Sequence, residues 1–235
     1  MPVDNKFQAS NTPFDLTRYD CPYEVERIRI LKAIMTSGQG KSAIDIGCGP
    51  GYFSRELTTN GWKTLSVDTD SQNIEHTKKH AHETLTGDAL SVLPKLKENQ
   101  YDLALALEII EHMPKAQGKL LVSEINRILK PGGKLILSTP NRHSPEGLGG
   151  YYWGEKIRGW EKWTAYDPTH VYIYSASEIV RLLELSGFSV ARITGYFYEG
   201  RLPLIGHWKL PLMKSTRFPL NRVGFNTILE CYKTS

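Results

Sequence analysis

The sequence predicts an α/β fold in which a largely parallel β-sheet is covered by helices on both faces. From Ser42 onward, short apolar runs typical of strands alternate with segments of helical spacing. The run Tyr101–Leu107 is almost continuously apolar, as expected of a central strand buried on both faces. At 235 residues, 40% of them hydrophobic, the chain can bury one sizeable core, so we expect a single domain over residues 1–235.

The first elements lead into a glycine-rich turn. Apolar residues recur near helical spacing over Tyr23–Met35, which predicts a lead-in helix. Ala43–Ile46 is a short apolar strand, and Tyr52–Thr59 again has helical spacing. The loop Gly47-Cys48-Gly49-Pro50-Gly51 lies between this strand and this helix.

The later elements continue the alternation. Further strands are predicted at Thr64–Val67, Glu83–Thr86, Lys134–Ser138, Ser189–Tyr198 and Asn226–Lys233. Further helices are predicted at Asn73–His82, Lys119–Leu129 and Ser177–Ser186. These elements divide the domain into a core (about 40–140), an acceptor-side lid (about 141–170) and C-terminal strands with a loop (171–235). The lid segment is rich in Gly, Tyr and Trp and longer than a connection needs, which is typical of a functional loop.

Composition argues against several other classes of protein. The formal net charge is +4, but the basic residues are scattered, so a nucleic-acid partner is not expected. Three widely spaced cysteines without a CxxC pair suggest neither a disulfide framework nor a zinc site. No apolar stretch reaches the length of a signal peptide core or a membrane span, so we expect a cytoplasmic protein without a transmembrane segment.

The glycine loop and two carboxylates indicate a nucleoside-binding site. Glycines between a strand and a helix let the backbone turn sharply and approach a ligand closely. Their spacing is GxGxG rather than the GxGxxG that cradles a dinucleotide pyrophosphate, which argues against NAD. Asp68 ends the next strand and could accept hydrogen bonds from ribose hydroxyls, and Asp88 could accept one from an adenine amino group.

These motifs, in this order, resemble those of class I S-adenosylmethionine-dependent methyltransferases. The resemblance rests on Asp45–Gly51, Val67-Asp68, Gly87-Asp88-Ala89, the strand into Glu108, and Leu129–Lys134. It implies a Rossmann-like doubly wound sheet of seven strands, mostly parallel with an antiparallel last strand, and S-adenosylmethionine as cofactor. It also implies that Gly47, Gly49 and Gly51 line the methionine and ribose side, Asp68 holds the ribose, Asp88 and Ala89 face adenine, and Asp45 lies near the methionine amino group.

A second group of residues marks the acceptor side. Glu108, Glu111 and His112 follow the fourth strand, and His170 comes much later. The order ExxEH with a distant His resembles ubiquinone-biosynthesis O-methyltransferases and small-RNA 2′-O-methyltransferases, in which four such residues hold Mg²⁺. The resemblance therefore implies a metal site of Glu108, Glu111, His112 and His170 and an acceptor hydroxyl activated there. Glu111, His112 and His170 are the predicted catalytic residues. Two alternatives to the metal site stay open: a metal-free site in which His112 or His170 acts catalytically, and a purely structural role.

The predicted function is methyl transfer from S-adenosylmethionine, with O-methylation of a small hydroxylated molecule as the first choice. An RNA 2′-O-methyltransferase and a non-catalytic cofactor-binding module are the alternatives. Aromatic and basic residues alternate from Tyr151 to Tyr166, and Arg201–Arg222 is rich in proline and apolar residues. The first segment could stack an aromatic or sugar acceptor or nucleic-acid bases, or form the packed underside of a lid. The second could close the same pocket or contact a membrane surface or a second subunit. The acceptor itself, its reacting atom and the oligomeric state are not predicted.

Overall fold

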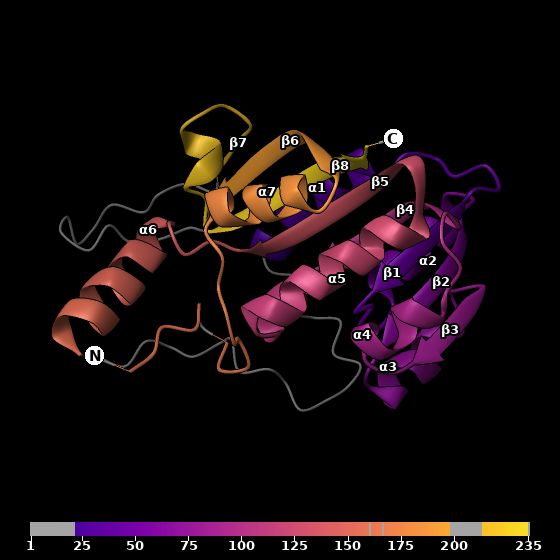
Figure 1. Ribbon diagram of the computed structural model, residues 1–235, viewed down its shortest axis with the longest axis horizontal. Helices are drawn as coiled ribbons and strands as arrows, with labels where there is room; N and C mark the ends of the chain where they lie inside the picture. Colours follow the sequence, from indigo (N-terminus) through magenta and orange to yellow (C-terminus); the bar gives the residue numbers. More distant parts are fainter. Residues whose placement is uncertain (1–21, 160, 166, 198–212, 235) are drawn as a thin grey trace.

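A computed structural model describes residues 22–197, except 160 and 166, and residues 213–234. These residues form one eight-stranded sheet with helices on both faces (Figure 1). The predicted α/β class, with a mostly parallel doubly wound sheet, is therefore confirmed. The predicted lead-in helix is α1 (Pro22–Ile34), whereas the aromatic residues Trp160 and Tyr166 and residues 201–212 of the proline-rich segment lie outside the described residues.

The strands are arranged around a reversal in their order. They are β1 (Ser42–Ile46), β2 (Lys63–Asp68), β3 (Glu83–Thr86), β4 (Tyr101–Leu107), β5 (Leu129–Pro140), β6 (Phe188–Phe197), β7 (Met213–Ser215) and β8 (Asn226–Lys233). Their order across the sheet is β3-β2-β1-β4-β5-β8-β6-β7. Strands β1 to β5 pair in parallel, whereas β8 is antiparallel to both β5 and β6. The order reverses between β1 and β4, and ligands bind at the carboxyl ends of strands beside such a reversal.

The helices complete two cores, one on each face of the sheet. They are α1 (Pro22–Ile34), α2 (Tyr52–Thr59), α3 (Ser71–Thr77), α4 (Ala89–Val92), η2 (Leu93–Lys95), η3 (Ile110–His112), α5 (Lys115–Ile128), α6 (Pro145–Gly147), the π-helix η4 (Leu148–Ile157), α7 (Ala176–Leu185) and η5 (Leu220–Arg222). Leu103 and Leu105 of β4 join the core under α1 and α2, while Ala104 and Ala106 join the core under α5 and α7. Successive side chains of a strand point to opposite faces, so β4 must be apolar throughout.

The sheet has one strand more than the seven predicted. The additional strand, β7, pairs antiparallel with β6 at the edge of the sheet. It has only three residues, Met-Lys-Ser, too few to show an alternating apolar pattern. The predicted antiparallel last strand corresponds to β8.

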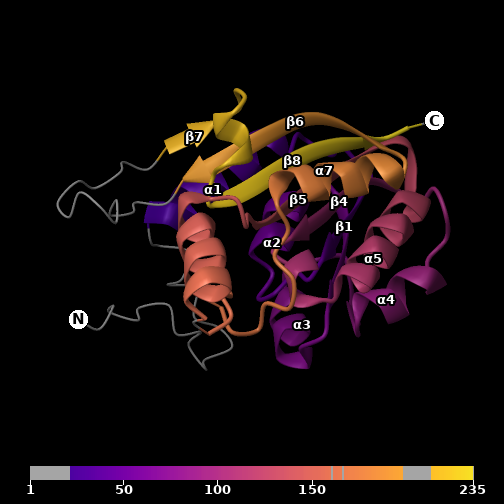
Figure 2. The same ribbon diagram turned by 60° about the vertical axis from the view of Figure 1, so that its left-hand side comes forward.

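The secondary structure of the lid differs from the prediction more than that of the sheet does, because much of the segment 141–170 is helical rather than a loop. Helix α6 continues directly into η4. In Figures 1 and 2 this helix stands beside the sheet, apart from the helices that cover its faces. Its sequence, with Gly149 and Gly150 within ten residues, has low intrinsic helix propensity, which is why the sequence pattern favoured a loop.

Candidate active site

The glycine-rich loop leads from the carboxyl end of β1 into α2. Gly47, Gly49 and Gly51 have φ angles of 71°, 52° and 83°, in the left-handed region that glycine adopts without steric penalty. A Cβ at Gly51 would lie 2.5 Å from Oγ1 of Thr77 in α3. A larger residue could not pack here without displacing α3. The loop therefore presents backbone rather than side chains at this edge of the sheet.

Asp68 lies at the end of β2 and faces the same loop. Its Oδ2 accepts a hydrogen bond from the Gly49 amide at 2.8 Å, and its Oδ1 accepts one from the Asp70 amide at 2.9 Å. The half-buried carboxylate is thus oriented by two backbone amides. The predicted binding of ribose by Asp68 requires this proximity to the glycine-rich loop. The ribose-binding role itself stays a prediction.

Asp88 and Ala89 follow β3 at the same edge. The exposed Asp88 carboxylate accepts a hydrogen bond from the Leu90 amide at 2.8 Å and so caps α4, while Ala89 is buried. The capping bond gives Asp88 a structural role. Its predicted contact with adenine stays a prediction.

Asp45 is buried near the end of β1. Its Oδ2 accepts a hydrogen bond from Ser54 Oγ at 2.6 Å, and Ser66 Oγ donates to the Ser54 hydroxyl at 2.8 Å. Burial raises the pKa of Asp45 to about 6, although the Ser54 hydrogen bond opposes the shift. The Asp45 carboxyl group is therefore hydrogen-bonded to α2. Its predicted position near the methionine amino group of the cofactor stays a prediction.

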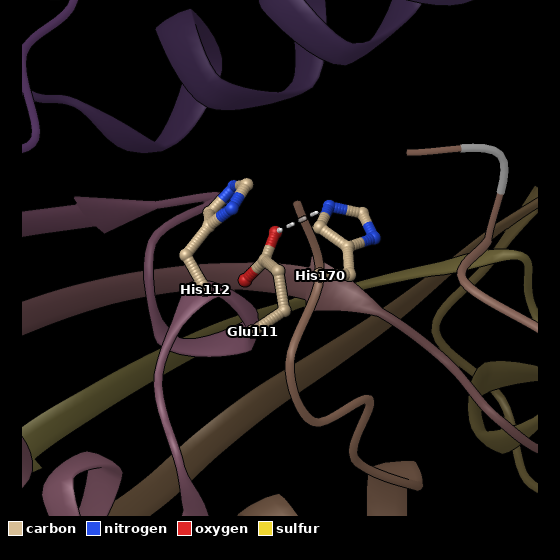
Figure 3. Close-up of side chains that lie close together, drawn as sticks. All are labelled: Glu111, His112 and His170. Atoms are coloured by element: carbon tan, nitrogen blue, oxygen red, sulfur yellow. Dashed lines mark ion pairs between the residues drawn. The ribbon is translucent and has the colours of Figure 1, made fainter. Parts of the chain in front are cut away.

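Three of the predicted acceptor-side residues come together in a group that we call the acceptor cluster: Glu111, His112 and His170 (Figure 3). Glu111 and His112 belong to η3, shortly after β4, and His170 lies at the end of the lid. One nitrogen or carboxylate oxygen from each residue lies within 4.8 Å of the others. Glu111 and His170 are buried, whereas His112 is exposed, so the cluster is open to solvent on the His112 side.

Hydrogen bonds fix which ring nitrogen of each imidazole faces the cluster. His170 Nδ1 lies 2.7 Å from the Thr164 carbonyl oxygen, which can only accept. His112 Nδ1 lies 3.1 Å from Thr169 Oγ1, whose own proton goes to Asp167 Oδ1 at 2.6 Å. Nδ1 therefore carries the proton in each neutral ring, and each Nε2 keeps a lone pair. Burial and the nearby His112 lower the pKa of His170, which keeps its ring neutral.

The Glu111 carboxyl places an unsatisfied oxygen beside these lone pairs. Thr139 Oγ1 donates to Glu111 Oε2 at 3.1 Å. Oε1 is buried without a hydrogen-bond partner among the described residues and lies 3.9 Å from His170 Nε2. Burial and the negative charge of Glu108 raise the pKa of Glu111 well above its usual value. A buried carboxylate oxygen that faces an imidazole lone pair needs a proton or a cation between them.

Glu108, the fourth predicted metal ligand, is not among the three residues of the acceptor cluster. Its carboxylate accepts hydrogen bonds from Ser138 Oγ and from Asn226 Nδ2, the latter at 2.9 Å to each oxygen. Its backbone φ of 53° is unusual for a residue other than glycine, as is common at functional sites. The structure thus joins Glu108 to β5 and β8, and its role as a ligand stays a prediction.

Arg27 of α1 is a candidate functional residue that the sequence interpretation missed. It is only 3% exposed, its Nη2 lies 2.8 Å from Glu24 Oε2, and its Nη1 lies 3.9 Å from Glu108 Oε1. It also lies 5.7 Å from the ring centroid of Phe53 in α2. The helical spacing of α1 could have identified Arg27 as a buried charge, because it precedes the buried Leu31 by one turn and so shares the buried face of the helix.

The fold and the site agree with comparisons with known proteins. Residues 19–193 match the family described as "Methyltransferase domain". The chain belongs to this methyltransferase family. The methyltransferase is 28% identical to the ubiquinone biosynthesis O-methyltransferase of Idiomarina loihiensis over 68% of this chain and 66% of that protein. It is 30% identical to the protein of the same name from Rickettsia canadensis, over 66% of each chain. The match thus spans slightly less than two thirds of these relatives.

A solved structure extends the likeness to most of the methyltransferase fold. The SAM-dependent methyltransferase of Archaeoglobus fulgidus superposes with a TM-score of 0.67 over 92% of this chain and 96% of that one, at 20% identity. The predicted resemblance to S-adenosylmethionine-dependent methyltransferases is confirmed at the level of family and fold. None of the described helices is both long and apolar enough to cross a membrane.

Proposed function

We propose that this methyltransferase transfers a methyl group from S-adenosylmethionine to a hydroxyl oxygen of a small molecule. The observation that carries the proposal is the acceptor cluster, which combines two imidazole lone pairs with a buried carboxylate at the carboxyl edge of the sheet. The names of the similar curated proteins, O-methyltransferases, support an oxygen acceptor. We also propose that residues 1–235 act as one domain, in which the lid covers the acceptor side.

The donor would bind along the carboxyl ends of β1, β2 and β3. When bound, S-adenosylmethionine supplies an electrophilic methyl group on a sulfonium sulfur. Asp68 would accept hydrogen bonds from its ribose hydroxyls, and Asp88 would accept one from adenine. The Arg27 guanidinium, which lies beside Glu108 and Phe53, would provide positive charge for the amino-acid carboxylate of the donor.

His112 is the best-placed base for the acceptor hydroxyl. It is the exposed member of the acceptor cluster, and its Nε2 carries a lone pair because Nδ1 donates to Thr169. The hydrogen bond from Thr169 to Asp167 would stabilise the imidazolium that forms when Nε2 takes up the proton. Transfer itself then depends mainly on proximity and alignment of oxygen, methyl carbon and sulfur.

The acceptor cluster also fits a divalent cation. Each Nε2 atom keeps a lone pair, Glu111 Oε1 becomes a third donor when its carboxyl group loses its proton to the cation site, and both Nδ1–H groups are held by oxygen acceptors, as is usual for metal-bound histidines. Two imidazoles suit Mn²⁺, Fe²⁺ or Zn²⁺ better than the Mg²⁺ predicted from the resemblance. A bound cation would lower the pKa of the acceptor hydroxyl.

The proposal is tested with chelator-treated protein, labelled S-adenosylmethionine and catechol as the probe acceptor. We expect an O-methylated product, identified by mass spectrometry. His112→Ala should bind S-adenosylhomocysteine normally but lose transfer by about 100-fold or more, because general acid–base catalysis typically contributes that much. Restoration of activity by Mn²⁺ would favour the metal-dependent route, and full activity without metal the His112 route.

Two results would contradict this proposed function. Methylation on nitrogen, carbon or sulfur of a broad acceptor panel, with no O-methylated product, would refute the oxygen acceptor. Preference for an oligonucleotide, falling steeply with salt, would instead support the RNA alternative.

A further inference from the structure

The lid helix formed by α6 and η4 rests on the indole of Trp163. A Cβ at Gly150 would collide with the indole ring, and a Cβ at Gly147 would lie 3.0 Å from its Cη2. These two glycines, three residues apart, give the ring a flat backbone surface. The Trp163 amide also donates to Glu155 Oε2 at 3.1 Å, which ties the same residue to η4 a second time.

The residues after Trp163 connect it to the two histidines of the acceptor cluster. The Thr164 carbonyl accepts the hydrogen bond from His170 Nδ1, and the Asp167 amide donates to this carbonyl at 3.2 Å. Thr169 accepts the hydrogen bond from His112 Nδ1. The orientation of both imidazoles therefore depends on the path of this segment.

The same segment is attached to Glu111 through the backbone. The Glu111 carbonyl accepts hydrogen bonds from the Val171 amide at 2.8 Å and the Tyr172 amide at 3.0 Å. Lys162 Nζ donates to the Val171 carbonyl at 2.9 Å. One short stretch of chain thus contacts the lid helix at its beginning and the acceptor cluster at its end.

We propose that Trp163 is a positioning residue whose packing on Gly147 and Gly150 holds His170 against Glu111. The acceptor cluster is then complete only while the lid helix contacts the indole. An acceptor that presses on the lid would shift His170 without touching it, which couples acceptor binding to assembly of the site. The catalytic consequence rests on the proposed O-methyltransferase function, whereas the positioning of His170 does not.

Gly150→Ala tests the contact, and Gly149→Ala is its matched control. Both changes replace a glycine of η4 by alanine. A Cβ at Gly149 meets open space, whereas a Cβ at Gly150 meets the indole. Any general effect of alanine on the helix is therefore shared by the two variants.

The first readout is hydrogen exchange, which does not depend on catalysis. The amides of Val171 and Tyr172, bonded to Glu111, should exchange about tenfold faster in Gly150→Ala than in wild type, because local opening becomes easier. Gly149→Ala should match wild type. Equal exchange in the two variants would refute the proposal.

The second readout is methyl transfer to catechol. Gly150→Ala should lower kcat/KM by about 100-fold, as a small misplacement of a catalytic group can do, while binding S-adenosylhomocysteine as wild type does. A loss of transfer without faster exchange at Val171 and Tyr172 would also overturn the proposal. If wild type transfers no methyl group, the proposed function fails and exchange alone still decides the role of Trp163.

Trp163→Ala removes the indole from the same contact and introduces no collision. We expect it to accelerate the same amides, and the double variant with Gly150→Ala to exchange no faster than the faster single variant. Additive acceleration would show that the two residues act independently and would refute their shared role.

Discussion

At the scale of single residues, two buried carboxyl groups of the candidate site differ in how their oxygens are hydrogen-bonded. Asp45 is satisfied by Ser54 and lies behind the glycine loop, whereas Glu111 keeps one buried oxygen without a partner among the described residues. Burial raises the pKa of both groups. A raised pKa in the folded state means that ionisation opposes folding, so both residues are held at a cost to stability.

Asp45→Asn should remove a pH dependence of stability. The folded pKa is about 6 and the ordinary value is 3.8, so the wild-type contribution falls as pH rises from about 4 to about 6. The shift corresponds to about 3 kcal/mol. Relative to wild type, the variant should therefore gain about this much unfolding free energy between pH 4 and pH 7. Urea unfolding at both pH values measures the gain, and an equal difference at the two values would contradict it.

Sequence reasoning identified residues at this scale where type, order and spacing act together. The loop from Gly47 to Gly51, Asp68 and the pair Glu111-His112 all lie at the carboxyl edge of the sheet as expected. The position of Glu108 could not be predicted, because its partner Asn226 is 118 residues away and is supplied by the antiparallel β8. A motif gives the residue types near one point of the chain but not the side chains that later strands bring to it.

At the scale of elements, boundaries were predicted best where a strand or helix has a clear local signal. The predicted and observed limits agree for Tyr52–Thr59, Tyr101–Leu107 and Asn226–Lys233. Helix α3 ends five residues earlier than predicted, and the lid contains a helix that was not predicted. The lid helix is stabilised by Trp163, which follows it in sequence, so its own residues give only a weak signal.

Helix α7 offers a test of a local signal. Ser175 accepts a hydrogen bond from the Glu178 amide at 3.2 Å, and Glu178 Oε2 accepts one from the Ser175 amide at 2.9 Å, which forms a capping box. Ser175→Ala should lower the free energy of unfolding by about 1 kcal/mol. In a domain of this size that corresponds to about 2–4 °C in melting temperature. The exposed Ser177→Ala in the same helix is the control and should change little; equal losses would argue against the cap.

At the scale of the whole molecule, the proposed donor and acceptor sides come from different parts of the chain. The proposed donor side consists of the ends of β1, β2 and β3, all within the first 90 residues. The proposed acceptor side combines η3 with His170 at the end of the lid. The strand order reverses between β1, which leads into the glycine loop, and its neighbour β4, which leads towards η3, so the fold places the two regions on adjacent strands.

This division predicts that donor binding stabilises the whole domain without needing the acceptor cluster. At about 100 times its dissociation constant, S-adenosylhomocysteine should add about 2.7 kcal/mol to the free energy of unfolding. In a domain of this size that raises the melting temperature by roughly 5–10 °C. Asp68→Ala should lose most of this shift at the same ligand concentration, because the carboxylate proposed to hold the ribose is gone, whereas Glu111→Gln should retain it. Differential scanning fluorimetry with NAD as the control ligand measures the effect. A shift with NAD, or equal losses in both variants, would show that the donor does not bind where the glycine loop and Asp68 meet.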